Sequence, residues 1–151
     1  MENIIVPFII SVAISLFMTP VARKLAIKLG AVDIPKDERR VHNKPMPLMG
    51  GLAIYIAILV SSLVFLPIDK TLVSIIIGGS IICISGIIDD IKGLSPKAKL
   101  VFQVIASIVL IIGDVKIDAI TSPFGKPGAV LLLNGFSIPI TIFWVVELPI
   151  L

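Results

Sequence analysis

The chain has 151 residues, of which 57% are hydrophobic and only 15% are charged. A soluble domain carries about 25% charged residues, so this composition excludes an ordinary water-soluble fold and favours a membrane protein. The formal net charge is +3, and the single cysteine, Cys83, excludes a disulfide framework. The lipid bilayer, and not a nucleic acid, is the partner that this composition indicates.

Five apolar runs follow one another along the chain. Each is a candidate span, because a helix needs roughly 20 apolar residues to cross the bilayer core. The predicted spans are about 4–22, 49–66, 72–88, 97–113 and 138–151. The fourth follows Ser95 and Pro96, a good N-cap and first-turn pair, and the fifth is barely long enough to cross. The sequence thus predicts an all-α polytopic membrane protein with four to five transmembrane helices, as a single membrane domain over residues 1–151.

The stretch between the fourth and fifth runs has a different character. Val115, Ile117 and Ile120 alternate with polar residues, and residues 124–128 are rich in turn formers. The apolar residues 129–133 follow. This pattern is typical of a small β-hairpin, which we place outside the bilayer on the extracytoplasmic side.

Lysine and arginine residues gather in alternate connectors. Seven lie in the loop from Arg23 to Lys44 and three in the stretch from Asp89 to Lys99, against three in the other connectors. By the positive-inside rule, these two loops face the cytoplasm and the amino terminus lies outside.

The first of these loops carries a basic cluster, which consists of Arg39, Arg40, His42 and Lys44. Guanidinium groups suit phosphate because their planar fork donates two parallel hydrogen bonds, so one interpretation is an anion site at the membrane surface. The alternative is structural. The basic residues would then set topology and attract anionic headgroups, while Gly50 and Gly51 would begin a closely packed helix.

The adjacent carboxylates Asp89 and Asp90 lie at the carboxyl end of the third span, where the helix dipole is already negative. A structural role gives no reason for that placement, whereas a divalent cation or a strong basic partner would relieve the repulsion. Mg²⁺ typically uses one or two carboxylates together with substrate phosphates. The alternative is that both are solvated and balanced by Lys92, Lys97 and Lys99.

Three segments, in this order, resemble the polyprenyl-phosphate N-acetylhexosamine-1-phosphate transferases. They are Gly30 to Pro35, Arg39 to Gly51 and Gly86 to Gln103. These bacterial membrane enzymes begin teichoic-acid and O-antigen linkage-unit synthesis. The chain is most similar to the undecaprenyl-phosphate GlcNAc-1-phosphate transferase branch of glycosyltransferase family 4, and the resemblance covers nearly its whole length.

The resemblance implies transfer of N-acetylglucosamine-1-phosphate from UDP-N-acetylglucosamine to undecaprenyl phosphate, with Mg²⁺ as cofactor, in the bacterial cytoplasmic membrane. It implies that Asp89 and Asp90 bind or deprotonate the lipid phosphate and that either could ligate the metal. The expected phosphate-binding residues are Arg39, Arg40, His42, Lys44 and Lys97. The expected loop and packing motif is Asp33, Pro35, Pro45, Pro47, Gly50 and Gly51. A homodimer is a further expectation.

The chain also departs from the family pattern. Relatives are roughly twice as long and carry, after the fifth span, a motif that supplies the main metal aspartate, which this sequence lacks. We therefore expect the amino-terminal half of a larger fold. Two alternatives stay open: the related phospho-MurNAc-pentapeptide transferase and, in another class, a non-catalytic truncated membrane protein or subunit.

Overall fold

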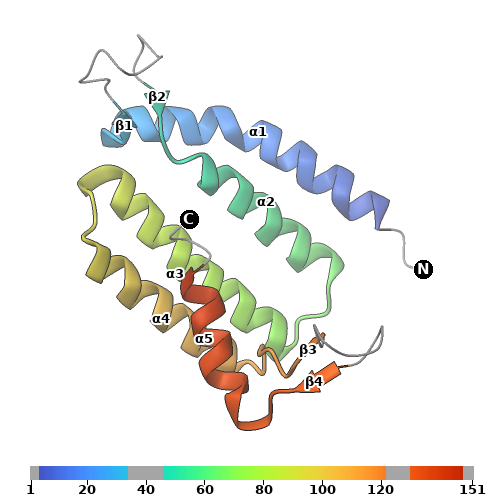
Figure 1. Ribbon diagram of the computed structural model, residues 1–151. Helices are drawn as coiled ribbons and strands as arrows, with labels where there is room; N and C mark the ends of the chain where they lie inside the picture. The colour runs from blue at the N-terminus through green and yellow to red at the C-terminus, as the bar shows by residue number, and fades with distance from the viewer. Residues whose placement is uncertain (1–3, 34–45, 122–129, 148–151) are drawn as a thin grey trace. The chain divides into compact units, whose positions relative to one another are not determined.

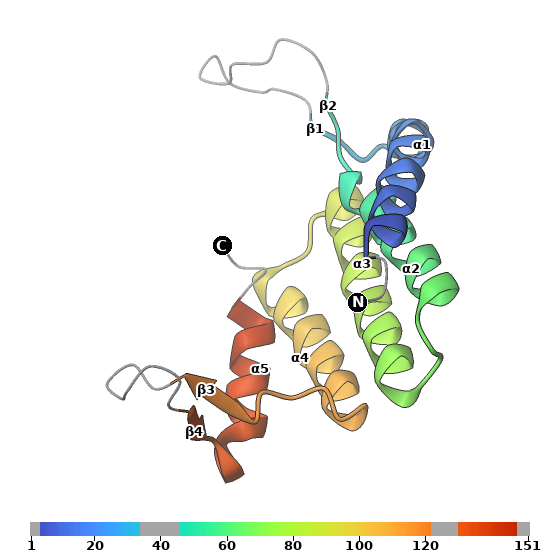
Figure 2. The same cartoon turned by 90° about the vertical axis from the view of Figure 1, so that its right-hand side faces the viewer.

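The computed structural model describes residues 4–33, 46–121 and 130–147 (Figures 1 and 2). Within them the helices are α1 (Ile5–Leu29), α2 (Gly50–Phe65), α3 (Lys70–Lys92), α4 (Pro96–Ile112), α5 (Ser137–Glu147) and the short 3-10 helix η1 (Asn134–Phe136). The strands are β1 (Val32–Asp33), β2 (Met46–Pro47), β3 (Ala119–Thr121) and β4 (Val130–Leu132). They form two antiparallel pairs, β1 with β2 and β3 with β4. The first pair was not predicted from the sequence.

The helices α1 and α3 extend beyond their apolar runs, which corrects two predicted loop boundaries. The helix α1 continues to Leu29, because the residues after Ala22 are good helix formers and no breaker intervenes before Gly30. Gly30 then adopts a φ of 74° and its N–H bonds to carbonyls of the last turn, a common way to end a helix. The helix α3 likewise continues to Lys92, and Gly93 follows it with a φ of 70°.

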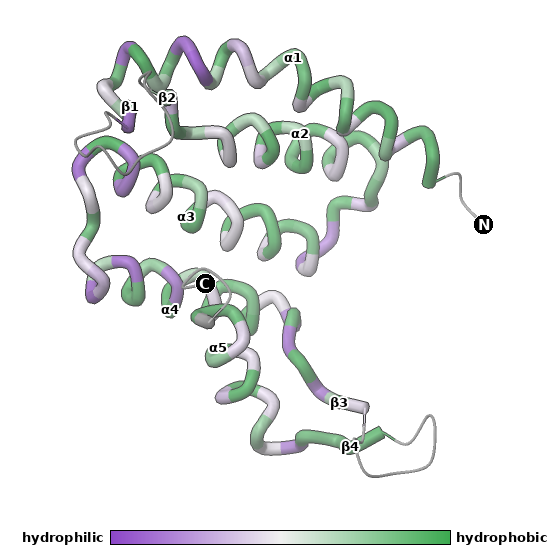
Figure 3. Tube along the Cα trace, turned by 45° about the horizontal axis from the view of Figure 1, so that its top comes forward, coloured by the Kyte–Doolittle hydropathy of each residue, from purple (hydrophilic) through white to green (hydrophobic). Residues whose placement is uncertain are grey.

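Two helices, α1 with 25 residues and α3 with 23, are long and apolar enough to cross a membrane. At 1.5 Å per residue they reach about 37 and 34 Å, against about 30 Å for the bilayer core. Figure 3 shows the helices as mainly hydrophobic, with hydrophilic residues towards the ends of α1 and α3 that precede Gly30 and Gly93. The chain is a mainly helical membrane protein. The number of spans stays a prediction.

The contacts divide the chain into two compact units, and α3 contributes to both. The first unit comprises residues 1–68 and 82–95, and the second comprises 69–81 and 96–151. A single membrane domain over residues 1–151 stays a prediction.

Small residues bring α1 and α2 together in the first unit. The buried positions repeat every four residues, which places them on one face of each helix. They are Ala22 and Ala26 in α1 and Ala53, Ala57 and Ser61 in α2. Further along this face the hydroxyls of Ser11 and Ser61 lie 2.8 Å apart. Such small residues allow two helix backbones to approach closely where lipid surrounds them.

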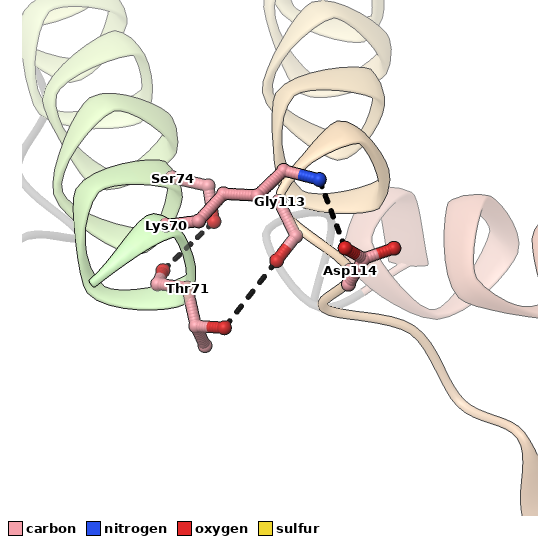
Figure 4. A network of polar contacts seen from close by, with 5 residues as sticks. All are labelled: Lys70, Thr71, Ser74, Gly113 and Asp114. Carbon is pink, nitrogen blue, oxygen red and sulfur yellow. Dashed lines mark hydrogen bonds and ion pairs between the residues drawn. The ribbon is translucent and has the colours of Figure 1, made fainter.

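In the second unit, the beginning of α3 packs against the end of α4. Gly78 faces Leu110, and a Cβ at Gly113 would collide with the Cβ and Oγ of Ser74. Around this contact, Thr71 Oγ1 lies 3.4 Å from the carbonyl oxygen of Gly113, and Lys70 Nζ lies 2.9 Å from Asp114 Oδ2 (Figure 4). This group of contacts fixes how the two helices pair.

The predicted hairpin between α4 and α5 is the pair β3 and β4. Its register places Ala119 opposite Leu132 and Thr121 opposite Val130. Its extracytoplasmic location stays a prediction.

Candidate functional site

The two candidate catalytic aspartates lie in the last turn of α3, not in a loop. Both side chains are half-buried. The carboxylate of Asp90 reaches the beginning of α2, where its Oδ2 accepts a hydrogen bond of 2.9 Å from the backbone N–H of Met49. The structure therefore brings together two of the sequence segments that carried the family resemblance.

Met49 forms an unusual helix start. It is the residue before α2, it has a φ of 67°, and its side chain is 4% exposed. A positive φ is uncommon for a residue with a side chain, because Cβ then crowds the backbone. The conformation directs the Met49 N–H to Asp90, and Gly50 and Gly51 follow it as exposed residues at the amino end of the helix.

Asp89 accepts hydrogen bonds from the residues that follow the carboxyl end of α3. Its backbone carbonyl accepts a 2.8 Å hydrogen bond from Gly93 N–H, and its Oδ1 accepts one of 2.8 Å from Leu94 N–H. Each aspartate thus has a structural partner, which corrects the expectation that a structural role gives no reason for their placement. The contacts do not exclude chemistry, since a carboxylate has two oxygens and about four lone-pair sites.

A small core supports this end of the first unit. Ala26, Ala31 and Met49 are buried against one another, with Leu52 and Ile87 packed alongside. Next to this core in the chain, β1 pairs with β2, so that Asp33 lies opposite Met46 and Val32 opposite Pro47. The backbone of Leu48 also bonds to Ala31, at 2.9 Å. The chain just before Met49 is therefore held against the end of α1, and this fixes the Met49 N–H that Asp90 binds.

The other predicted site residues fall into three groups. Asp33, Pro47, Gly50 and Gly51 lie at the same end of the first unit as Asp90. Lys97 is exposed in the first turn of α4, in the second unit. The remaining residues lie outside the described part of the chain: Pro35, Arg39, Arg40, His42, Lys44 and Pro45. Sequence reasoning missed Met49, because nothing in the sequence marks a methionine for a positive φ.

The residues present fit part of a Mg²⁺ site. Carboxylate oxygens are the ligands that Mg²⁺ prefers, and Asp89 and Asp90 supply two carboxylates at one helix end. No group of three or more potential metal ligands occurs among the described residues. A cation bound here would need substrate phosphates or water to complete its shell.

The first unit also has a cavity of about 650 Å³, but it lies far from the aspartates along α1 and α2. Its lining is mainly apolar and includes Phe8, Ile58 and Phe65, with Ser11 and Ser61 as the polar members. None of the described residues that line it is charged.

Residues 72–149 match the family model of glycosyl transferase family 4. This chain belongs to that family. The matched segment includes Asp89, Asp90 and Lys97 and leaves out the basic loop after α1. Family membership was predicted from the sequence and is confirmed.

Similar proteins carry consistent names. The chain is 37% identical to a probable undecaprenyl-phosphate N-acetylglucosaminyl 1-phosphate transferase of Bacillus subtilis, over 97% of this chain and 40% of that protein. It is 36% identical to the decaprenyl-phosphate N-acetylglucosaminephosphotransferase of Mycolicibacterium smegmatis, over 85% of this chain and 34% of the relative. It is 30% identical to an undecaprenyl-phosphate α-N-acetylglucosaminyl 1-phosphate transferase of Salmonella typhi, over 82% of this chain and 34% of that protein. No solved structure matches the chain.

Proposed function

We propose that this chain carries part of the active site of a phosphoglycosyl transferase in the bacterial cytoplasmic membrane. The reaction would transfer N-acetylglucosamine-1-phosphate from UDP-N-acetylglucosamine to undecaprenyl phosphate, as the first step of a cell-wall or surface polysaccharide linkage unit. The observation that supports it best is the pair Asp89 and Asp90, which lies in the segment that matches the family and of which Asp90 binds the residue before α2. The names of the relatives agree with this reaction.

In the proposed reaction, a phosphate oxygen of the lipid attacks the sugar-bearing phosphorus of the donor. A new P–O bond joins the two phosphates, the bond between the sugar-bearing phosphorus and the bridging oxygen of the donor breaks, and UMP leaves with that oxygen and the electron pair. Such transfers depend mainly on positioning and on neutralising charge. Asp90 is our candidate for binding or deprotonating the lipid phosphate, with Asp89 beside it.

Positive charge would complete the site. Mg²⁺, when bound, would neutralise phosphate charge, with Asp89 or Asp90 among its ligands. Lys97 is a candidate for holding a phosphate, and so are the basic residues of the loop after α1: Arg39, Arg40, His42 and Lys44. We also propose that this end of the first unit faces the cytoplasm, where the UDP-sugar is found, with the amino terminus outside.

The first experiment measures UMP release from UDP-N-acetylglucosamine in proteoliposomes that contain undecaprenyl phosphate and Mg²⁺. Because the chain spans 40% of the length of the Bacillus relative, the assay uses both the 151-residue chain and a chimaera in which it replaces the matching segment of that relative. UMP release by either supports the proposal. No release by either, with full activity of the unmodified relative and a chimaera that still binds undecaprenyl phosphate, contradicts it.

The second experiment separates charge from structure at Asp90 in the active form. Asp90→Asn keeps an oxygen that can accept the Met49 N–H, so the fold should persist while the negative charge is lost. We expect UMP release to fall about 100-fold or more, as when an acid–base or metal-binding group is removed. Asp114→Asn, in the second unit, is the matched control and should keep most of the activity. An Asp90→Asn variant as active as this control would rule out the catalytic role.

The same assay separates the remaining alternatives. Release of UMP only from a UDP-MurNAc-pentapeptide donor would indicate the related pentapeptide transferase. Activity of the chimaera without activity of the 151-residue chain would support a chain that is non-catalytic by itself.

A further inference from the structure

The hairpin between α4 and α5 exposes an apolar surface that the catalytic proposal does not use. Both strands are exposed along their whole length. The exposed fractions are 58% for Val130, 72% for Leu132 and 71% for Phe136 in η1. No charged residue occurs in β3, β4 or η1.

The register places apolar residues on both faces of this hairpin. Cross-strand partners share a face, so Ile120 and Leu131 lie on one side and Val130 and Leu132 on the other. A two-stranded hairpin is at best marginally stable in water unless a hydrophobic face is covered. An uncharged, apolar edge strand in water would also invite aggregation. Water is therefore a poor environment for this element.

Hydrogen bonds fix the base of the hairpin to the ends of the helices that it connects. Ser137 Oγ donates to Asp118 Oδ1 at 2.8 Å, and the backbone N–H of Ile117 donates to Thr141 Oγ1 at 2.9 Å. On the other side, the N–H of Val115 bonds to the carbonyl of Leu110 in the last turn of α4, at 2.9 Å. The hairpin thus cannot move far from the point where α4 ends and α5 begins.

The apolar surface of these helices continues onto the hairpin. Ile112 at the end of α4 is 65% exposed, and Ile138 at the start of α5 is 50% exposed. In a membrane protein such side chains face lipid. No charged residue lies between β4 and Ile138 in the chain, so on the α5 side the apolar surface extends to η1 and β4. On the α4 side, the charged residues Asp114, Lys116 and Asp118 lie between Ile112 and β3.

We propose that the pair β3 and β4, with η1, lies in the bilayer interface and binds the lipids of the leaflet next to the junction of α4 and α5. Its depth is limited, because the open strand edges need hydrogen-bond partners that the hydrocarbon core lacks. Headgroups and interfacial water supply them, while the apolar side chains enter the outer part of the acyl region, as interfacial helices do. The hairpin would then anchor this junction in the membrane. This inference does not rest on the proposed reaction.

Tryptophan quenching in vesicles tests the proposal. Trp144 is the single tryptophan, so Trp144→Phe provides a background in which Leu132→Trp reports on the hairpin alone. Phosphatidylglycerol and phosphatidylethanolamine vesicles carry bromine either near the headgroups or near the methyl ends of the acyl chains. We expect bromine near the headgroups to reduce the fluorescence by about half or more, and deep bromine or aqueous iodide to reduce it much less.

Two further variants keep the test decisive. Phe136→Trp in the same background is a conservative replacement, in case Leu132→Trp does not fold. Lys92→Trp, at an exposed position in a charged stretch, should be quenched by iodide, which is supplied on both sides of the membrane, and serves as the control. Strong iodide quenching at both hairpin positions would show that the hairpin lies in water. Protection from both quenchers would show that protein covers it, as in a dimer, and either result would overturn the proposal.

Discussion

At the scale of single residues, Met49 shows how strain and burial compete at one position. Its side chain is buried, so its removal should cost roughly 2 to 5 kcal/mol. Its φ of 67° favours glycine, because a left-handed conformation costs other residues about 1 to 2 kcal/mol. We therefore expect Met49→Gly to be less destabilising than Met49→Ala by about 1 kcal/mol, the reverse of the usual order in a helix.

Thermal unfolding of both variants in detergent micelles measures this difference. The same pair of substitutions at Ile54, which is exposed within α2, serves as the control, and there alanine should be the more stable. Equal or greater destabilisation by glycine at Met49 would contradict the left-handed conformation.

Asp114 has a direct charge partner at the surface. The hydrogen bond and charge of Lys70 hold the pKa of Asp114 below its usual value of 3.8. A lowered folded-state pKa contributes stability above the unfolded value, and this contribution is lost as the pH falls through the folded one. Because both side chains are largely exposed, the effect should be small and should weaken in salt.

Lys70→Gln should therefore lower the unfolding temperature near neutral pH, and this difference from the wild type should shrink as the pH falls below 3.8 and through the lowered folded-state pKa of Asp114. The measurement is thermal unfolding in micelles from neutral pH into the acid range, at low and high salt. A difference that grew as the pH fell would show that the ion pair does not contribute in this way.

At the scale of helices, α3 and α4 pair through a contact that tolerates no added methyl group. Gly113→Ala would place a Cβ against the Cβ and Oγ of Ser74. Overpacking of this kind usually costs about 1 to 3 kcal/mol. We expect Ser74→Gly to rescue Gly113→Ala in part, since it removes both clashing atoms, and Ser74→Ala to rescue it less, since its Cβ remains. Additive effects in denaturant unfolding would argue against the contact.

The helices also show what sequence reasoning could reach. Each of the helices α1 to α5 lies over one of the five apolar runs, because long apolar runs dominate helix placement in a membrane protein. Residues 148–151 of the fifth predicted span lie outside the described part of the chain, and the spans themselves stay predictions. The ends of α1 and α3 were wrong, because charged residues such as Lys28 and Asp90 were assigned to loops although they are compatible with helix. The glycines that do end these helices were visible in the sequence. The pair β1 and β2 is two residues long on each side, too short to give a periodic signal.

Sequence reasoning selected residues of the candidate site but not their arrangement, and the roles given to these residues stay predictions. The two aspartates and the paired glycines were identified from the sequence, and the structure adds that Asp90 binds the residue before those glycines. That contact joins residues 41 positions apart, so local pattern could not reveal it. Its source is the pairing of β1 with β2, which holds the segment before α2.

At the scale of the whole molecule, the distribution of charge predicts orientation. Ten of the thirteen lysine and arginine residues lie in the two connectors that we place in the cytoplasm. In a Cys83→Ser background, Lys92→Cys should react with a membrane-impermeant maleimide only from the cytoplasmic side, and Lys116→Cys only from the outside. Both labels on one side would contradict the proposed orientation.

The hydrogen bond between Asp90 and Met49 has a kinetic consequence. It closes a loop that contains all of α2 and nearly all of α3, so the two partners meet only after both helices have formed. Closing so long a loop has an entropic cost that local helix formation does not have. Removal of the Asp90 side chain should therefore speed unfolding and leave the folding rate nearly unchanged. The hydrogen bond between Met49 and Asp90, the aspartate proposed for catalysis, would then form late in folding and break early in unfolding.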